Sequence, residues 1–208
     1  MENNRLTNVN QTWGFCGFIS ILSHLNSRRP LAEIPSDHQV VTRMGAEVIT
    51  QLRIMSIEEP NLTDEIVQFT NQFSTLVDTP HFEDIEQVIA FVEARLLQFD
   101  AGQHQGNNFI AGVALPPNAV RSILNRLDLN IEHEGQQLDR LTSVIIGIGS
   151  TGNPDNINYN NLTHWIYLDP NGNISDNGTT RAFNVYQNDV MNHHEFEIKH
   201  VFQLREQN

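Results

Sequence analysis

The segment THWIYLDPNGNISD, residues 163–176, contains the clearest strand and turn in the sequence and decides the fold class. Residues 164–168 are aromatic, aliphatic or β-branched, a composition typical of strands. Residues 169–173 predict a tight turn, because proline presets its backbone φ angle and Gly and Asn tolerate left-handed geometry. A strand that ends in such a turn predicts a β-sheet in this part of the chain.

Three further strands are predicted, all after residue 140. Residues 143–148 form a short apolar run with β-branched members, which is typical of a buried strand. A strand is also predicted at 182–186. Residues 195–204 alternate well enough between apolar and polar side chains to form the last one.

Helical periodicity dominates the chain before residue 128. The first helix begins near Cys16, and Phe18, Ile21, Leu22 and Leu25 lie on one face of it. Capping residues and apolar stripes predict four more helices, at 37–57, 63–76, 82–99 and 118–127. Helices followed by strands indicate an α+β fold. We expect one domain over residues 1–208, with a helical part at about 12–128 and a sheet part at about 140–205.

Composition excludes several functions. The net charge is −13 and no cluster of Lys and Arg occurs, which argues against nucleic acid as a partner. No run of about 20 apolar residues is present, so no membrane span is expected. The single cysteine excludes a disulfide framework and a multi-cysteine zinc site. No signal-peptide pattern follows Met1, so we expect a cytoplasmic protein or one exported by a dedicated secretion system.

Cys16 is the candidate nucleophile. A helix N-terminus favours the thiolate through the helix dipole and the backbone N–H groups. Gly14 and Gly17 flank the cysteine and leave room for a substrate carbonyl. A histidine beside the thiol would complete an ion pair and carry protons.

His164 is the candidate partner, and an acid behind it would fix the imidazole. Asp169 lies five positions later in the same predicted strand, roughly 16 Å away at about 3.3 Å per residue, which is too far. Asp176 follows the turn and can return beside His164. We therefore favour Asp176 as the third member and keep Asp169 as the alternative.

These residues together resemble the papain-like cysteine hydrolase superfamily. The stretch NQTWGFCGFIS, residues 10–20, is similar to the segment in which a glutamine precedes the nucleophile and donates to the oxyanion. Gln11 is favoured for that role, with Asn10 as the alternative. The order Cys, His, Asp also matches. The resemblance implies an N-terminal helical lobe packed on a C-terminal antiparallel β-sheet, with the site between them.

The resemblance also implies the chemistry. We expect a cysteine hydrolase that acts on an amide bond of a protein or peptide substrate, of the kind used by bacterial effectors and toxins, and no cofactor or metal. A glutamine deamidase or acyl-transfer effector and a peptidoglycan amidase are the alternatives. The usual third residue of those amidases is a second histidine, where this chain has Asp176. A non-enzymatic alternative is a protein-binding module formed by the acidic helical block at 33–99.

Two metal-like patterns compete with this interpretation. Residues 169–173 resemble the start of a calcium loop, but Ile174 replaces the required glycine and Thr180 replaces the closing glutamate. His193, His194 and neighbouring residues lack the His-Glu-x-x-His spacing with which a helix binds zinc. Neither pattern predicts a metal site.

Overall fold

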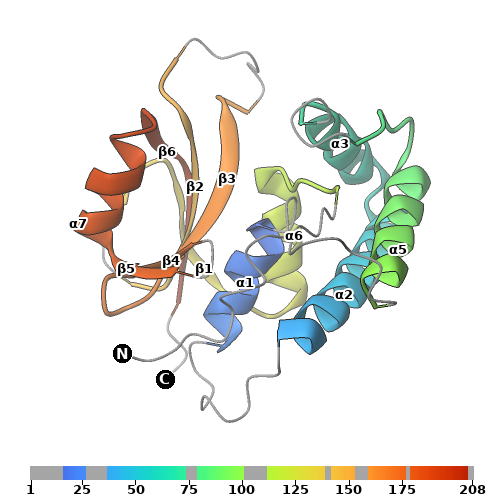
Figure 1. Cartoon of the computed structure of the whole chain (residues 1–208), viewed down its shortest axis with the longest axis horizontal. Coiled ribbons are helices and arrows are strands. Elements are labelled where there is room, and N and C mark those ends of the chain that lie inside the picture. The colour runs from blue at the N-terminus through green and yellow to red at the C-terminus, as the bar shows by residue number, and fades with distance from the viewer. Residues whose placement is uncertain are drawn as a thin grey trace.

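The computed structural model describes residues 16–26, 37–73, 79–100, 112–138, 142–152, 159–176 and 179–205. Within them it has five longer helices followed by a six-stranded sheet (Figure 1). Every strand pair in the sheet is antiparallel. The α+β class and the antiparallel sheet predicted from the sequence are confirmed.

The helices lie close to their predicted positions. Their bounds are α1 (Cys16–Asn26), α2 (Asp37–Glu58), α3 (Pro60–Asn71), α5 (Ile85–Asp100) and α6 (Pro117–Arg126). The predicted start of α3 at Thr63 is wrong, because Pro60 takes the first helical turn, where its missing N–H costs no hydrogen bond. The predicted end at Leu76 lies outside the described residues.

The strands are β1 (Ile131–Gly135), β2 (Val144–Ser150), β3 (Leu162–Leu168), β4 (Asn173–Asp176), β5 (Thr179–Ala182) and β6 (Phe196–Leu204). Their order across the sheet is β1-β6-β2-β3-β4-β5. The predicted strand at 182–186 is wrong: residues 183–186 form the short helix α7 (Phe183–Tyr186), which continues as the π-helix η3 (Gln187–Met191).

The sheet also begins earlier than predicted, at β1 and not near residue 140. The sequence of β1 is IEHEG, which has no run of apolar residues to mark it. The strand is held by pairing with β6, in which Ile131 lies opposite Leu204, and by contacts of Glu134 with other elements. A polar edge strand of this kind is defined by its neighbours and not by its own periodicity.

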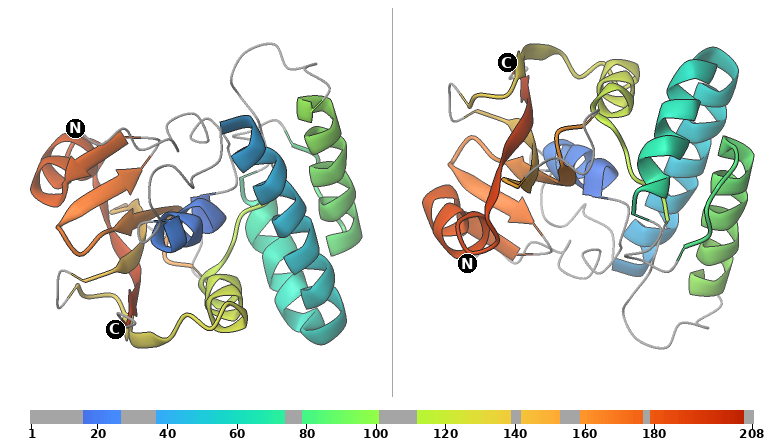
Figure 2. Two further views of the ribbon diagram at one scale, coloured as in Figure 1. Left: turned by 90° about the horizontal axis from the view of Figure 1, so that it is seen from below. Right: turned by 90° about the horizontal axis from the view of Figure 1, so that it is seen from above.

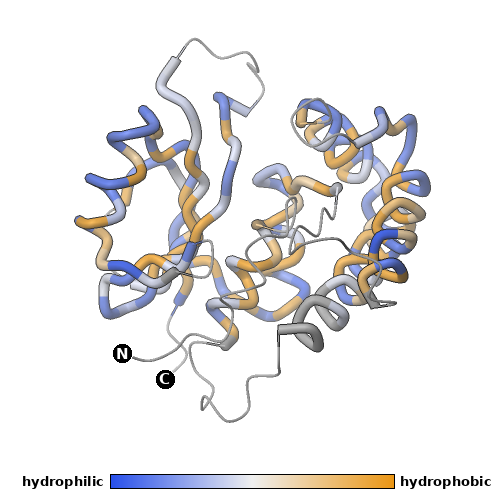
Figure 3. The backbone as a smooth tube through the Cα atoms, in the orientation of Figure 1, coloured by the Kyte–Doolittle hydropathy of each residue, from blue (hydrophilic) through white to orange (hydrophobic). Residues whose placement is uncertain are grey.

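Both faces of the sheet are covered (Figures 1 and 2). The helices α1, α2, α3, α5 and α6 lie on one side, and α7 with η3 lies on the other. A large apolar cluster joins the helices to one face through residues such as Phe18, Leu115 and Trp165. A smaller cluster, which includes Ile166 and Tyr186, lies under α7. Hydrophobic residues follow the central strands and alternate with hydrophilic ones along the helices (Figure 3).

Candidate active site

Cys16 is the first residue of α1, and its side chain is partly exposed. The helix packs against β3. A Cβ atom added at Gly17 would lie 3.0 Å from Leu115 Cδ1. The close approach of Leu115 therefore favours glycine at position 17, while Gly14 lies outside the described residues.

Leu115 also connects α1 to the strand that carries the histidine. The indole Nε1 of Trp165 donates a hydrogen bond to the carbonyl oxygen of Leu115 at 2.9 Å, and both side chains are buried. Because the buried indole N–H donates to a carbonyl, the hydrogen bond that it made to water in the unfolded chain is replaced and not simply lost. The contact holds β3 and the start of α1 in one packed unit.

His164 is the third residue of β3, and the strand is irregular at this point. Ile148 pairs with His164 and Gly149 pairs with Leu162, so Thr163 is an extra residue on β3. Such a β-bulge changes the direction of the strand and of the side chains next to it. The bulge therefore sets the direction of His164.

The loop before β3 requires a glycine on the neighbouring strand. A Cβ atom at Gly149 would lie 1.8 Å from the carbonyl oxygen of Asn161, so only glycine fits. Asn160 and Asn161 have φ angles of 50° and 60°, a left-handed conformation that asparagine tolerates better than most residues. These residues bring the chain closely over β2 and into the bulge before His164.

Asp176 lies next to His164 in space. The pairing of β4 with β3 returns the chain after the turn, and Asp176 Oδ1 lies 2.6 Å from His164 Nε2. The His164 side chain is 27% exposed and that of Asp176 is 9% exposed. The carboxylate is therefore shielded from water, while the imidazole remains accessible.

The imidazole of His164 interacts with Cys16 as well as with Asp176. Burial alone would lower the pKa of His164, but hydrogen bonds to the side chains of Asp176 and Cys16, and the electrostatic effect of these two side chains, raise it to about 10. The ring is therefore an imidazolium at neutral pH. Because Asp176 occupies Nε2, the other ring nitrogen, Nδ1, is the one left for Cys16.

Asp169 does not contact the histidine. Its Oδ1 accepts hydrogen bonds from the backbone N–H groups of Asn171 at 2.9 Å and Asn173 at 2.8 Å. These contacts close the turn between β3 and β4. Asp169 thus shapes the hairpin that places Asp176, and the structure brings Asp176, not Asp169, to His164.

The oxyanion candidates Gln11 and Asn10 lie outside the described residues. Among the residues that are described, no group of three or more His, Cys, Asp or Glu side chains could hold a metal ion. His200, one of the histidines near the C-terminus, lies 2.9 Å from Glu134 Oε1, which also accepts a hydrogen bond from Arg121.

Tyr186 is a site residue that the sequence did not reveal. Its hydroxyl donates a hydrogen bond to Asp176 Oδ2 at 2.7 Å, so each oxygen of the carboxylate has a partner. The tyrosine was expected in a strand, and no spacing between it and His164 marks it. Only the position of α7 brings it to the carboxylate.

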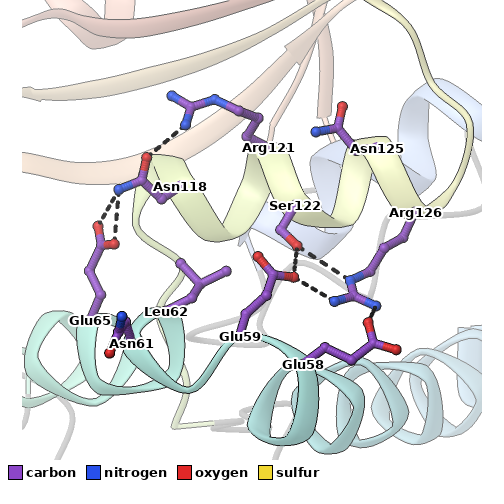
Figure 4. A pocket seen from close by; sticks show the side chains of 10 residues that line it. All are labelled: Glu58, Glu59, Asn61, Leu62, Glu65, Asn118, Arg121, Ser122, Asn125 and Arg126. Atoms are coloured by element: carbon purple, nitrogen blue, oxygen red, sulfur yellow. Dashed lines mark hydrogen bonds and ion pairs between the residues drawn. The ribbon is translucent and has the colours of Figure 1, made fainter.

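A separate polar groove of about 610 Å³ lies between the α2–α3 junction and α6 (Figure 4). None of the described residues that line it belongs to α1, β3 or β4. Three of its charged groups bind one another, because Arg126 bridges Glu58 and Glu59, and Ser122 donates to Glu59 at 2.6 Å. This network joins the helices to each other and is distinct from the Cys16 site.

Comparison of the chain with protein-family models, curated proteins and solved structures found no match. The described helices include none with the length and apolar character needed to cross a membrane. The interpretation of the site therefore depends on its own geometry.

Proposed function

We propose that this chain is a papain-like cysteine hydrolase that cleaves an amide bond with Cys16, His164 and Asp176 as its triad. The observation that supports it is a single, partly exposed imidazole that contacts both the only thiol of the chain and a shielded carboxylate. Residues far apart in the sequence converge there from α1, β3 and β4. A thiol, an imidazole and an orienting carboxylate in contact form the constellation used for nucleophilic catalysis by cysteine.

In the first step, the Cys16 thiolate attacks the carbonyl carbon of the substrate amide. The C–S bond forms, and the carbonyl electron pair moves to oxygen. The backbone N–H of Cys16 and the side chain of Gln11 are the proposed donors to this oxyanion, a contribution of about 3 kcal/mol for each donor. His164 then transfers its proton to the nitrogen as the C–N bond breaks, which releases an amine and leaves a thioester on Cys16.

In the second step, water hydrolyses the thioester. The neutral His164 takes a proton from the attacking water, the C–S bond breaks, and the carboxylic acid leaves. The proton returns the site to its thiolate–imidazolium state. Asp176 keeps Nε2 of the ring engaged throughout, so that the other nitrogen faces the thiol and the water. The proposed substrate is a protein or peptide.

Alkylation of Cys16 tests this proposal directly. An ordinary thiol is only about 0.3% ionised near pH 6. A thiolate paired with His164 should react with iodoacetamide roughly tenfold faster or more, although its lower nucleophilicity offsets part of the gain. His164→Ala should lose this acceleration. Because the chain has one cysteine, any thiol adduct is on Cys16, and Cys16→Ser is the negative control for alkylation of other residues.

Slow alkylation that His164→Ala does not change would contradict the proposal and favour a core cysteine in a binding module. The reaction itself is tested by comparing wild type, Cys16→Ala and His164→Ala for toxicity in a heterologous cytoplasm. Mass spectrometry of the affected proteins then distinguishes chain cleavage from deamidation of a glutamine side chain. Equal toxicity of all three proteins would contradict a thiol hydrolase.

A further inference from the structure

Tyr186 lies on the opposite face of the sheet from α1, where Cys16 is located (Figure 1). It is 2% exposed and packs in the smaller apolar cluster with Ile166, Ile174 and Met191. Its hydroxyl is nevertheless directed to a charged group, Asp176 Oδ2, at 2.7 Å. A buried hydroxyl bound to a carboxylate is a strong, charge-assisted contact.

The backbone around Tyr186 holds it in place from both sides. The N–H of Phe183, the first residue of α7, donates to the carbonyl oxygen of Gly172 in the β3–β4 turn at 2.8 Å. The π-helix η3 follows Tyr186 directly, with Asn192 N–H bound to Gln187 oxygen at 2.9 Å. A π-helix is rare and frequently occurs at functional sites. The helix that carries the tyrosine is thus tied to the hairpin that carries Asp176.

We propose that Tyr186 is a positioning residue that holds the Asp176 carboxylate ionised and fixes its orientation toward His164. The inference rests on the proposed function. With Oδ2 bound to the phenol and Oδ1 bound to the imidazole, the carboxylate cannot rotate without breaking one of the two contacts. The contacts of the triad thereby extend to α7.

Several charged groups affect the pKa values of the side chains that contact Asp176. Burial and the charge of Asp176 raise the pKa of Tyr186, while Arg181 on β5 opposes the shift, so the tyrosine stays a neutral donor. On the other side, Cys16 and Asp176 raise the pKa of His164 against the effect of burial. Loss of the phenol removes a donor to the ionised carboxylate, so the carboxylate should take up a proton at a higher pH.

The experiment is the pH profile of Cys16 alkylation in the full chain. Tyr186→Phe keeps the ring and removes the hydroxyl. The acidic limb of the profile, the pH range in which the alkylation rate falls as acid is added, should move upward by about 1 to 2 pH units. Tyr167→Phe removes another buried hydroxyl, which contacts Ser143, and should leave the limb unchanged. A purely structural tyrosine would lower the melting temperature without moving the limb, and that result overturns the inference.

Replacement of Tyr186 by 3,5-difluorotyrosine, which keeps both the ring and the hydroxyl, is the second variant if Tyr186→Phe does not fold. Its phenol is a stronger donor, so the limb should move to lower pH, and an unchanged limb counts against the inference. If Cys16 of the wild type reacts as an ordinary thiol, the hydrolase proposal fails. In that case the pKa of Asp176, measured by carboxyl NMR, decides the role of Tyr186: it should rise in Tyr186→Phe, and an equal value contradicts the inference.

Discussion

Replacing Asp176 by asparagine tests the electrostatic basis of the site. The variant keeps the shape of the side chain and removes its charge. In the native protein the carboxylate lies 2.6 Å from His164 Nε2, and its hydrogen bond and charge help raise the pKa of His164 from 6.5 to about 10. Because the Asp176 side chain is only 9% exposed, water cannot replace the lost charge fully.

The magnitude follows from the lost charge. The asparagine carbonyl can still accept a hydrogen bond from the imidazolium, and that bond remains charge-assisted, so what is lost is the attraction of the carboxylate. An opposite charge within about 4–6 Å shifts a pKa by about 1–3 units, so the pKa of His164 should fall by about 1–3.

The assay is a pH titration of the imidazole nitrogens by NMR in wild type and Asp176→Asn. Asp169→Asn is the matched control, because it removes a negative charge from the same hairpin, while the asparagine oxygen can still accept the backbone N–H groups of Asn171 and Asn173 that close the turn. That variant should leave the pKa of His164 unchanged. Two results would refute the reasoning: equal values in wild type and Asp176→Asn, or an equal fall in both variants.

Three further predictions concern stability. Gly149→Ala forces a Cβ against a backbone carbonyl 1.8 Å away and should cost about 1–3 kcal/mol in thermal unfolding, whereas Gly152→Ala, whose nearest atom is 3.5 Å away, should have little effect. The pKa of Glu134 is lowered below 4.5, chiefly by its hydrogen bond from an arginine, so its stabilisation is present above pH 4.5 and lost as the pH falls through the lowered value. The stability difference between wild type and Glu134→Gln should therefore shrink in acid. Glu132→Gln, on an exposed site of the same strand, is the control for removal of one negative charge. Trp165→Phe leaves a buried carbonyl without its donor and should destabilise the protein by about 1–3 kcal/mol in urea unfolding, and an unchanged midpoint would contradict the role given to that contact.

Local patterns in the sequence were sufficient for the fold class and most of its elements. Apolar side chains at helical spacing marked the long helices, and the turn at 169–173 marked the hairpin, because these signals arise from residues close together in the chain. β1 and α7 were missed or misassigned for the opposite reason. β1 is polar and exists through its pairing with β6, and α7 contains aromatic and β-branched residues that also favour strands.

The candidate site shows the same division. The sequence by itself determined which residues carry reactive groups: one thiol near a helix start, one histidine near the start of a strand and one acid after a turn. Only the tertiary structure decided which of these groups meet. The bulge at Thr163, the pairing of β3 with β4 and the position of α7 set the contacts of Asp176 with His164 and Tyr186. Such contacts join residues from separate elements, and a hydrogen bond forms only at the distance and angle that packing of the whole chain provides.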